Sequence, residues 1–295
     1  MESINRLKRF CLVFFIFIAG GSEIFALESQ NPKKCILVFG AHADDVESLA
    51  GGTFAKYIAQ GYQGIYVVVT NNTAGCLLER PPGDKEGGKF TVSRSPKTYP
   101  LGPLETMQIR AEESRQAAHV YGAIPIFLDF RETWFWQGRK QCYIGSDEFH
   151  NFAPPKRQIV SVATRLSEDI NVVYELLKKY QPEIVIIHTL GGEKHDHGNS
   201  AYIMYQAFKK AMEQNIPVGK LWMRARGWLL DEEARKYGRG RPDVQIDVKD
   251  YLEIKYRALN KHISQNGGDR GKYLQQIKAT DEVIEEFITV FDNTN

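Results

Sequence analysis

The sequence lacks the features that would tie it to a polyanion or a disulfide scaffold. Its 38 basic and 36 acidic residues leave a formal net charge of +2, which gives no electrostatic reason to expect nucleic acid as a partner. Four cysteines occur and none forms a CxxC pair, so a thiolate zinc site and a disulfide scaffold are both poorly supported. The remaining composition, 43% hydrophobic and 25% charged, is typical of a globular chain. Because the low net charge gives no case for a polyanion, we expect the partner to be a small molecule.

The N-terminal apolar run, residues 10–19, is shorter than the ~20 residues of a membrane-spanning helix, so we expect no stable membrane span. Arg6, Lys8 and Arg9 precede this run, and small residues follow it up to Ala26. This order is typical of a signal peptide, so residues 1–26 are expected to direct export to the periplasm or the medium. We expect a single domain over residues 27–295, and the sequence gives no indication of oligomeric state.

Apolar runs alternate with helical patterns along the chain. Strands are predicted over residues 34–40, 65–70, 124–128 and 183–188, and helices over residues 46–60, 104–121 and 171–180. This alternation predicts an α/β fold with a mostly parallel sheet and helices on both faces. Two long segments, residues 79–103 and 131–155, do not fit the alternation and are expected to be loops.

In such a fold, ligands bind beyond the carboxyl ends of the strands, which here means after Phe39 and His188. His42-Ala-Asp44-Asp45 follows the first of these strands. A histidine and a carboxylate three residues apart on a tight turn can point at one ion, which leaves Asp44 on the water side. The same residues also fit a simple helix cap made by Asp44 or Asp45. No Gly-x-Gly-x-x-Gly follows the strand, which argues against a dinucleotide site.

A second polar cluster, Glu193-Lys-His195-Asp196-His197, follows the predicted strand at residues 183–188. His197 would complete a set of two histidines and one carboxylate with an open position, which is the ligand set of catalytic zinc. His188 is expected to be a buried, hydrogen-bonded histidine.

These segments, taken in order, resemble the LmbE-like, or PIG-L, de-N-acetylases, which act on molecules that contain N-acetylglucosamine. The matching segments are residues 41–46 with Gly51-Gly52, residues 110–113 with Ala117 and Gly122, Asp129, residues 188–197, and residues 247–265. The resemblance implies a Rossmann-like fold and a zinc ion, although similar sites accept other divalent metals. It implies that His42, Asp45 and His197 are the metal ligands and that Asp44 is the carboxylate base.

The resemblance is imperfect in places. Ala43 stands where the family usually has proline, and Val46 where it usually has glutamate. The usual His-x-Asp-His reads Lys194-His195-Asp196-His197 here, so either His195 or Lys194 takes the place of the histidine that assists the oxyanion. We assign this role to His195.

Two further residues are candidates for substrate binding. By resemblance, Arg110 would bind a polar or anionic group of the substrate, while the alternative is a helix-surface salt bridge with Glu113 or Glu105. Asp129, just past a predicted strand end, is placed for a sugar hydroxyl.

The sequence therefore predicts a zinc-dependent hydrolase that removes an acetyl group from an N-acetylated amino sugar, free or within a glycan. Zinc would lower the pKa of a water and polarise the amide carbonyl, Asp44 would take the proton, and His195 would help hold the oxyanion. Two alternatives remain open. One is a deacylase for a longer acyl chain, with an apolar groove supplied by residues 134–149. The other is a carbohydrate-binding protein that retains the fold without the metal.

Overall fold

The computed structural model describes residues 34–73, 76, 78–79, 91–92, 103–132, 134–137, 140–143, 158–190, 196–225, 241–266 and 283–294. Residues 33–295 form one compact unit. The expected signal peptide, residues 1–26, lies outside the described residues. Within the described part of the chain, no helix combines the length and hydropathy that a membrane crossing requires.

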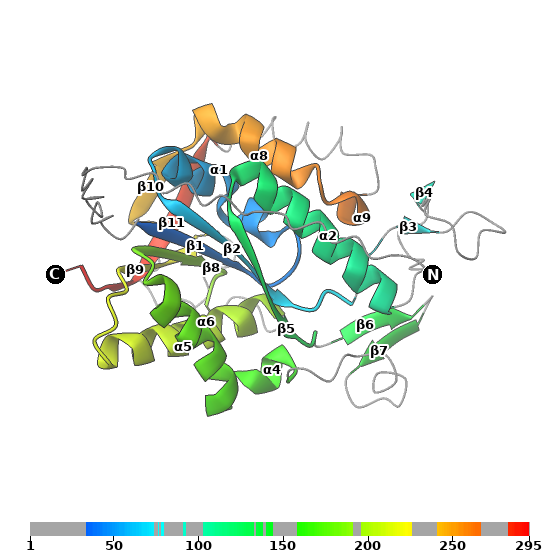
Figure 1. Cartoon of the computed structure of the whole chain (residues 1–295), viewed down its shortest axis with the longest axis horizontal. Coiled ribbons are helices and arrows are strands. Elements are labelled where there is room, and N and C mark those ends of the chain that lie inside the picture. Colours follow the sequence, from blue (N-terminus) through cyan, green and yellow to red (C-terminus); the bar gives the residue numbers. More distant parts are fainter. Residues whose placement is uncertain are drawn as a thin grey trace, which may run out of the picture. The chain divides into compact units, whose positions relative to one another are not determined.

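A seven-stranded sheet runs through the centre of this unit, in the strand order β10-β11-β9-β8-β1-β2-β5 (Figure 1). Its strands are β1 (Cys35–Gly40), β2 (Gln63–Thr70), β5 (Ile124–Phe130), β8 (Ile184–Ile187), β9 (Lys220–Arg224), β10 (Val244–Asp247) and β11 (Ile284–Asp292). The five strands from β9 to β5 run parallel. Beyond them, β11 pairs antiparallel with β9, and β10 pairs antiparallel with β11 at the edge of the sheet. The predicted α/β fold with a mostly parallel sheet is therefore confirmed.

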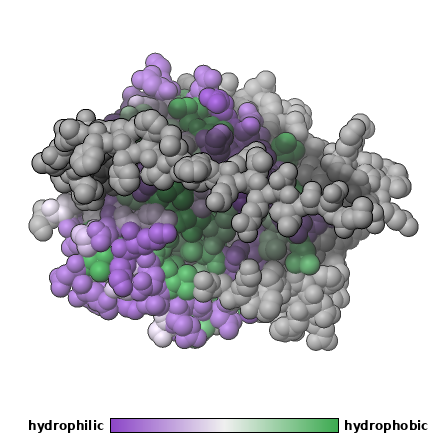
Figure 2. All heavy atoms as spheres, viewed as in Figure 1, coloured by the Kyte–Doolittle hydropathy of each residue, from purple (hydrophilic) through white to green (hydrophobic). Residues whose placement is uncertain are grey.

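Helices cover both faces of the sheet (Figure 1). One face carries α1 (Asp45–Ala59), α2 (Pro103–Tyr121) and α8 (Leu252–Leu259), and the other carries α4 (Val160–Ala163), α5 (Ser167–Tyr180) and α6 (Asp196–Glu213). Successive side chains of β1 alternate between the two cores: Ile36 and Val38 join the first, and Leu37 and Phe39 the second. All are fully buried, as expected for a central strand of a parallel sheet. The outer surface over α5 is mostly hydrophilic (Figure 2).

Several elements were not anticipated. The segments expected to be loops contain two short strand pairs, β3 (Leu78–Glu79) with β4 (Thr91–Val92) and β6 (Trp134–Gln137) with β7 (Lys140–Tyr143). The loop expectation is wrong for these residues, because aromatic residues such as those of β6 favour extended backbone. A 3₁₀ helix, η2 (Lys249–Tyr251), precedes α8, and a short helix, α9 (Ile263–Asn266), follows it.

Helix α1 is broken after its first turn, at Ala50, whose φ is −156° and ψ 26°. The helix restarts there, and the N–H groups of Gly52 and Thr53 donate to the two carboxylate oxygens of Glu285 in β11, at 3.0 and 2.7 Å. Lys255 Nζ from α8 lies 2.8 Å from the same carboxylate. Both side chains are buried, so this Lys255–Glu285 cap satisfies a helix start inside the protein with a charge from a distant strand.

The Gly51-Gly52 pair has a packing role. A Cβ at Gly51 would lie 2.8 Å from Lys255 Cγ and from the Tyr121 hydroxyl, and a Cβ at Gly52 would lie 2.5 Å from Val248 Cβ. The two glycines therefore allow α2, η2 and α8 to approach α1 closely. Together with the cap, they hold the C-terminal part of the chain against the helix that begins at Asp45.

Candidate active site

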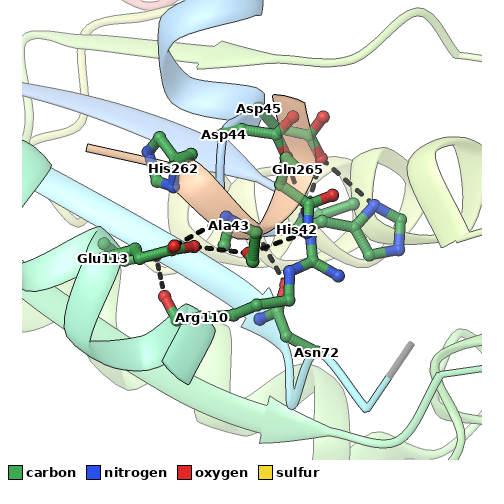
Figure 3. Close-up of polar contacts among 12 residues, drawn as sticks. His42, Ala43, Asp44, Asp45, Asn72, Arg110, Glu113, His262 and Gln265 are labelled. Atoms are coloured by element: carbon green, nitrogen blue, oxygen red, sulfur yellow. Dashed lines mark hydrogen bonds and ion pairs between the residues drawn. The ribbon is translucent and has the colours of Figure 1, made fainter. Parts of the chain in front are cut away.

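Polar side chains gather at the carboxyl ends of four neighbouring parallel strands. His42, Asp44 and Asp45 follow β1, Asn72 follows β2, Glu132 follows β5, and His188 and His197 follow β8. Figure 3 shows the β1 residues facing Arg110, which comes from α2. The predicted location of the site, beyond the ends of the strands, is the place where the structure brings these residues together.

Three of these groups have the spacing of metal ligands. Asp45 Oδ2 lies 3.4 Å from both His42 Nδ1 and His197 Nε2, and the two ring nitrogens lie 3.1 Å apart. Tetrahedral zinc with bonds of about 2.0 to 2.1 Å places its ligand atoms about 3.3 Å apart. The side chains His42, Asp45 and His197 therefore fit a zinc-sized ion as they stand.

The other nitrogen of His42 faces two buried carboxylates. His42 Nε2 lies 3.3 Å from Asp196 Oδ2 and 3.6 Å from Glu132 Oε1. These three residues form a second group that could hold an ion. A histidine that binds a metal through one nitrogen usually donates the hydrogen of the other to a carboxylate, which fixes the orientation of its ring. Because the Nδ1 side has the ligand spacing, we assign this orienting role to Asp196 and Glu132.

The electrostatics of the site favour positive charge. Burial opposes the protonation of His42, yet hydrogen bonds to Asp196 and Asp45 raise its pKa well above the ordinary value. Burial also opposes the ionisation of Asp45, but the nearby His197 and His188 hold the pKa of this carboxyl well below its usual range. Asp45 is therefore an ionised carboxylate surrounded by histidines, and the carboxylates around His42 stabilise positive charge on its ring. Both features favour the binding of a cation at this place.

His188 is buried and hydrogen-bonded, as predicted. Its Nε2 lies 3.2 Å from the Ala41 N–H and 3.2 Å from Asp45 Oδ2. Its ring stacks on that of His197, with centroids 4.2 Å apart and planes 6° from parallel. His188 therefore contacts Asp45 and His197, two of the three side chains that could hold a metal ion.

Asp44 differs from its neighbour in both backbone and environment. It occupies the N-cap position of α1 with a left-handed φ of 100°, and its side chain makes no capping hydrogen bond. The simple helix-cap interpretation is therefore wrong for Asp44. A non-glycine residue in this region is strained by about 1–3 kcal/mol, and such strain is typical of functional sites.

The Asp44 carboxylate is suited to proton transfer. Its side chain is 31% exposed, and one oxygen lies 3.6 Å from Arg110 Nη2. Partial burial and the charge of Asp45 raise its pKa to about 6, while Arg110 opposes this rise. A general base works best when its pKa is near the working pH, and this shift moves the pKa of Asp44 toward neutral pH.

Arg110 is directed into the site. Only 3% of its surface is exposed, and its guanidinium also lies 3.9 Å from Glu132 Oε1. The alternative of a helix-surface salt bridge is therefore wrong. Thr73 Oγ1 donates to the second oxygen of Glu132 at 2.7 Å, which fixes that carboxylate between a hydroxyl and a cation.

The structure places Asp129 differently from Glu132. Asp129 lies inside β5, half-buried, with a φ of 56° at an irregularity in the pairing of β5 with β2. The carboxylate that the end of β5 brings to the site is that of Glu132. The sequence analysis missed Glu132, and the available signal was its position just after the end of the strand. Substrate binding by Asp129 stays a prediction, and His195 lies outside the described residues.

A buried polar network lies behind the site. Glu47 Oε2 accepts a hydrogen bond from the Tyr66 hydroxyl at 3.0 Å and lies 3.3 Å from His262 Nε2, and all three residues are fully buried. Two residues further on, Ser264 donates through its N–H, at 2.7 Å, and through its hydroxyl to Glu113 of α2. These contacts attach the segment that joins α8 to α9 to the helices that carry Asp44 and Arg110.

A comparison with protein families decides the affiliation of this site. A family model described as PIG-L, GlcNAc-PI de-N-acetylase, matches residues 37–208, which is more than half of the chain. The chain belongs to the PIG-L family. The matched segment runs from β1 into α6 and so includes His42, Asp44, Asp45, Arg110 and His197.

Solved structures similar to this PIG-L family member share its fold. N,N'-diacetylchitobiose deacetylase from Pyrococcus horikoshii has a TM-score of 0.57 at 20% identity, over 90% of this chain and 88% of its own. A deacetylase of teicoplanin biosynthesis has a TM-score of 0.53 at 15% identity, over 88% and 99%. The 4-carboxy-2-hydroxymuconate hydratase from Pseudomonas putida has a TM-score of 0.52 at 19% identity, over 89% and 98%. The similar structures thus include both deacetylases and a hydratase, so the function has to be argued from the residues of the site.

Proposed function

We propose that this protein is a metal-dependent N-deacetylase that acts on an N-acetylated amino sugar. The observation that carries the proposal is the position of Asp44, whose pKa is raised to about 6, next to three donors with the spacing of zinc ligands. Family membership and the deacetylases among the similar structures agree with this chemistry.

His42, Asp45 and His197 would hold the ion. A divalent metal held there would lower the pKa of a water and polarise an amide carbonyl. Asp44 accepts the proton of the attacking water, and Arg110 favours the ionised state of Asp44 that this step needs. Asp44 then returns the proton to the leaving nitrogen as the carbon–nitrogen bond breaks. Acetate and a free amino sugar are the products.

The buried pair of Arg110 and Glu132 is suited to the sugar. A guanidinium and a carboxylate side by side can donate to and accept from the hydroxyl groups of one ring. We retain His195 as the group that assists the oxyanion, with Lys194 as the alternative, on the resemblance of their sequence motif.

Acetate release from a panel of N-acetylglucosamine compounds tests the proposal directly. The mature protein, loaded with zinc, is compared with the Asp44→Asn and His197→Ala variants. Release should fall about 10²- to 10⁴-fold in Asp44→Asn, because the general base is lost while the zinc ligands remain. His197→Ala should lose zinc as well as activity. Zinc binding without release from any panel member would reject an acetylated amino sugar as the substrate, and longer acyl amides would then be tested.

We also propose that residues 1–26 direct export. The first residues of the protein recovered from the periplasm or the medium, read by N-terminal sequencing, test this. A chain recovered from the cytoplasm that still begins at Met1 would reject it.

A further inference from the structure

The backbone N–H of Ala43 is a buried donor in the middle of the catalytic turn. Ala43 is fully buried, and it lies between the metal donor His42 and the base Asp44. Its N–H donates to Oδ1 of Asn72 at 2.7 Å, across the gap between the ends of β1 and β2 (Figure 3). A buried backbone N–H that loses its acceptor destabilises a protein, so this turn depends on the Asn72 side chain.

Asn72 is itself held in one orientation. Its φ is 57°, a left-handed conformation that asparagine tolerates better than most residues. Its Nδ2 donates to the Thr70 carbonyl oxygen at 2.8 Å, and the residue is 2% exposed. With the amide nitrogen engaged by Thr70, the amide oxygen can only face Ala43.

The conformation of Asp44 needs such support. A left-handed φ of 100° persists in a residue other than glycine only when its surroundings determine it. On the C-terminal side, the Ser48 N–H donates to the Asp44 carbonyl oxygen at 3.2 Å, within the first turn of α1. On the N-terminal side, the bond from Ala43 to Asn72 comes from another part of the fold. It fixes the peptide between His42 and Ala43, which lies one peptide before the Cα that carries the Asp44 side chain.

We propose that Asn72 is a positioning residue for the reaction. By fixing Ala43, it sets the direction in which the Asp44 carboxylate points relative to the donor atoms of His42 and Asp45. The inference rests on the proposed function for the role of Asp44, whereas the contact itself stands on the structure alone.

A double-mutant cycle tests the inference. Asn72→Gly removes the amide and still tolerates the positive φ, whereas Ala43→Pro removes the N–H that needs the amide. Asn72→Gly alone should lower kcat for acetate release about 100-fold, because the base is displaced, with KM changed far less. It should also raise the unfolding equilibrium constant about 5- to 150-fold, because a buried donor loses its acceptor. With proline at position 43, adding Asn72→Gly should change both quantities by only about twofold. Equal losses in the two backgrounds would overturn the inference.

Amide hydrogen exchange gives a readout that needs neither proline nor activity. The Ala43 amide of the metal-free protein should be protected, and Asn72→Gly should remove that protection. Asn71→Ala is the matched control, because Asn71 is equally buried and uses its backbone N–H for Phe130 instead. Protection of Ala43 that survives Asn72→Gly, or a kcat that does not change once protection is lost, would overturn the proposal. If the wild-type protein cuts no amide, and Asn72→Gly nevertheless removes the protection of the Ala43 amide, the proposed function is rejected and the contact itself is confirmed.

Discussion

Two carboxylates face helix α1, one at its start and one at its break. Asp44, at the start, has a strained left-handed backbone, a side chain that is partly open to solvent, and a pKa raised to about 6. Glu285, at the break, is fully buried and receives hydrogen bonds from Gly52, Thr53 and Lys255. Burial opposes its ionisation, but the Lys255 charge and these hydrogen bonds hold its pKa below the usual range.

The difference shows how one helix serves stability and chemistry at once. A carboxylate whose oxygens are all engaged is fixed in the ionised state and cannot accept a proton usefully. A carboxylate such as Asp44, which is partly exposed and has a raised pKa, can exchange protons. The fold must then hold a strained backbone and a carboxylate whose ionisation is disfavoured. The Lys255–Glu285 cap and the Gly51-Gly52 packing stabilise the helix whose first turn carries that unfavourable group.

The largest effect should come from breaking the cap. Glu285→Ala leaves Lys255 as an unpaired buried charge and two helix N–H groups without an acceptor. We expect the free energy of unfolding to fall by about 3–5 kcal/mol, as measured by urea denaturation. Glu286→Ala is the control, because the side chain of Glu286, next to Glu285 in the sequence, accepts a hydrogen bond from Gln245 at the surface. This substitution should change the free energy of unfolding by less than about 0.5 kcal/mol. Similar losses in both variants would show that Glu285 is not a specific cap.

The packing beside the cap should give the next effect. In Gly52→Ala the new Cβ meets Val248, so we expect the free energy of unfolding to fall by about 1–3 kcal/mol. Thermal or urea unfolding measures this change. The loss should be smaller in a Val248→Gly background, where the opposing side chain is gone. An equal loss in both backgrounds would assign the cost to the helix backbone instead of the contact.

At the catalytic end, the carboxylates that orient His42 can be tested through metal affinity. Glu132→Gln and Asp196→Asn should each weaken zinc binding about 10- to 100-fold, because the ring of His42 loses an orienting partner. Competition with a chromophoric chelator measures the dissociation constant. Asp129→Asn provides the control and should leave zinc affinity unchanged, since Asp129 lies inside β5 and belongs to neither group of side chains that could hold an ion. Unchanged affinity in the first two variants would contradict the orienting role.

The smallest effect should be seen in how the free energy of unfolding depends on pH, where Asp44 and Glu285 should contribute with opposite signs. The folded-state pKa of Asp44 lies above its ordinary value of 3.8, so its contribution favours the fold at low pH and is lost as pH rises through about 6. The folded-state pKa of Glu285 lies below 4.5, so its contribution is present above pH 4.5 and is lost as pH falls below it. Urea titrations of the metal-free protein should therefore show Asp44→Asn gaining on wild type as pH rises from 3.8 to about 6, and keeping that gain above pH 6. Glu285→Gln should approach wild type as the solution is acidified, and shifts of the same sign in both variants would contradict the comparison.

The strength of the local signals explains which elements were predictable. The strands β1, β2, β5 and β8 are continuous apolar runs, and the helices that follow them end at residues such as Gly61 and Gly122, so their type and order could be read directly. Strand β11 contains the adjacent Glu285 and Glu286, which obscure the alternation expected of a strand. Because Glu285 is buried through partners in α1 and α8 that are distant in the chain, local periodicity could not reveal it.

The sequence by itself determined the order of the strands β1, β2, β5 and β8 and of the helices α1, α2 and α5, the end of the sheet at which polar residues gather, and the residue types that can bind a metal. These follow from periodicity and from the few side chains that bind divalent ions. The tertiary structure alone decided that Glu132, and not Asp129, reaches His42, that Arg110 is buried, and that Asn72 supports Ala43. Such contacts join residues that are far apart in the chain, and their geometry depends on the pairing of β1, β2 and β5 and on the backbone turn that follows each strand.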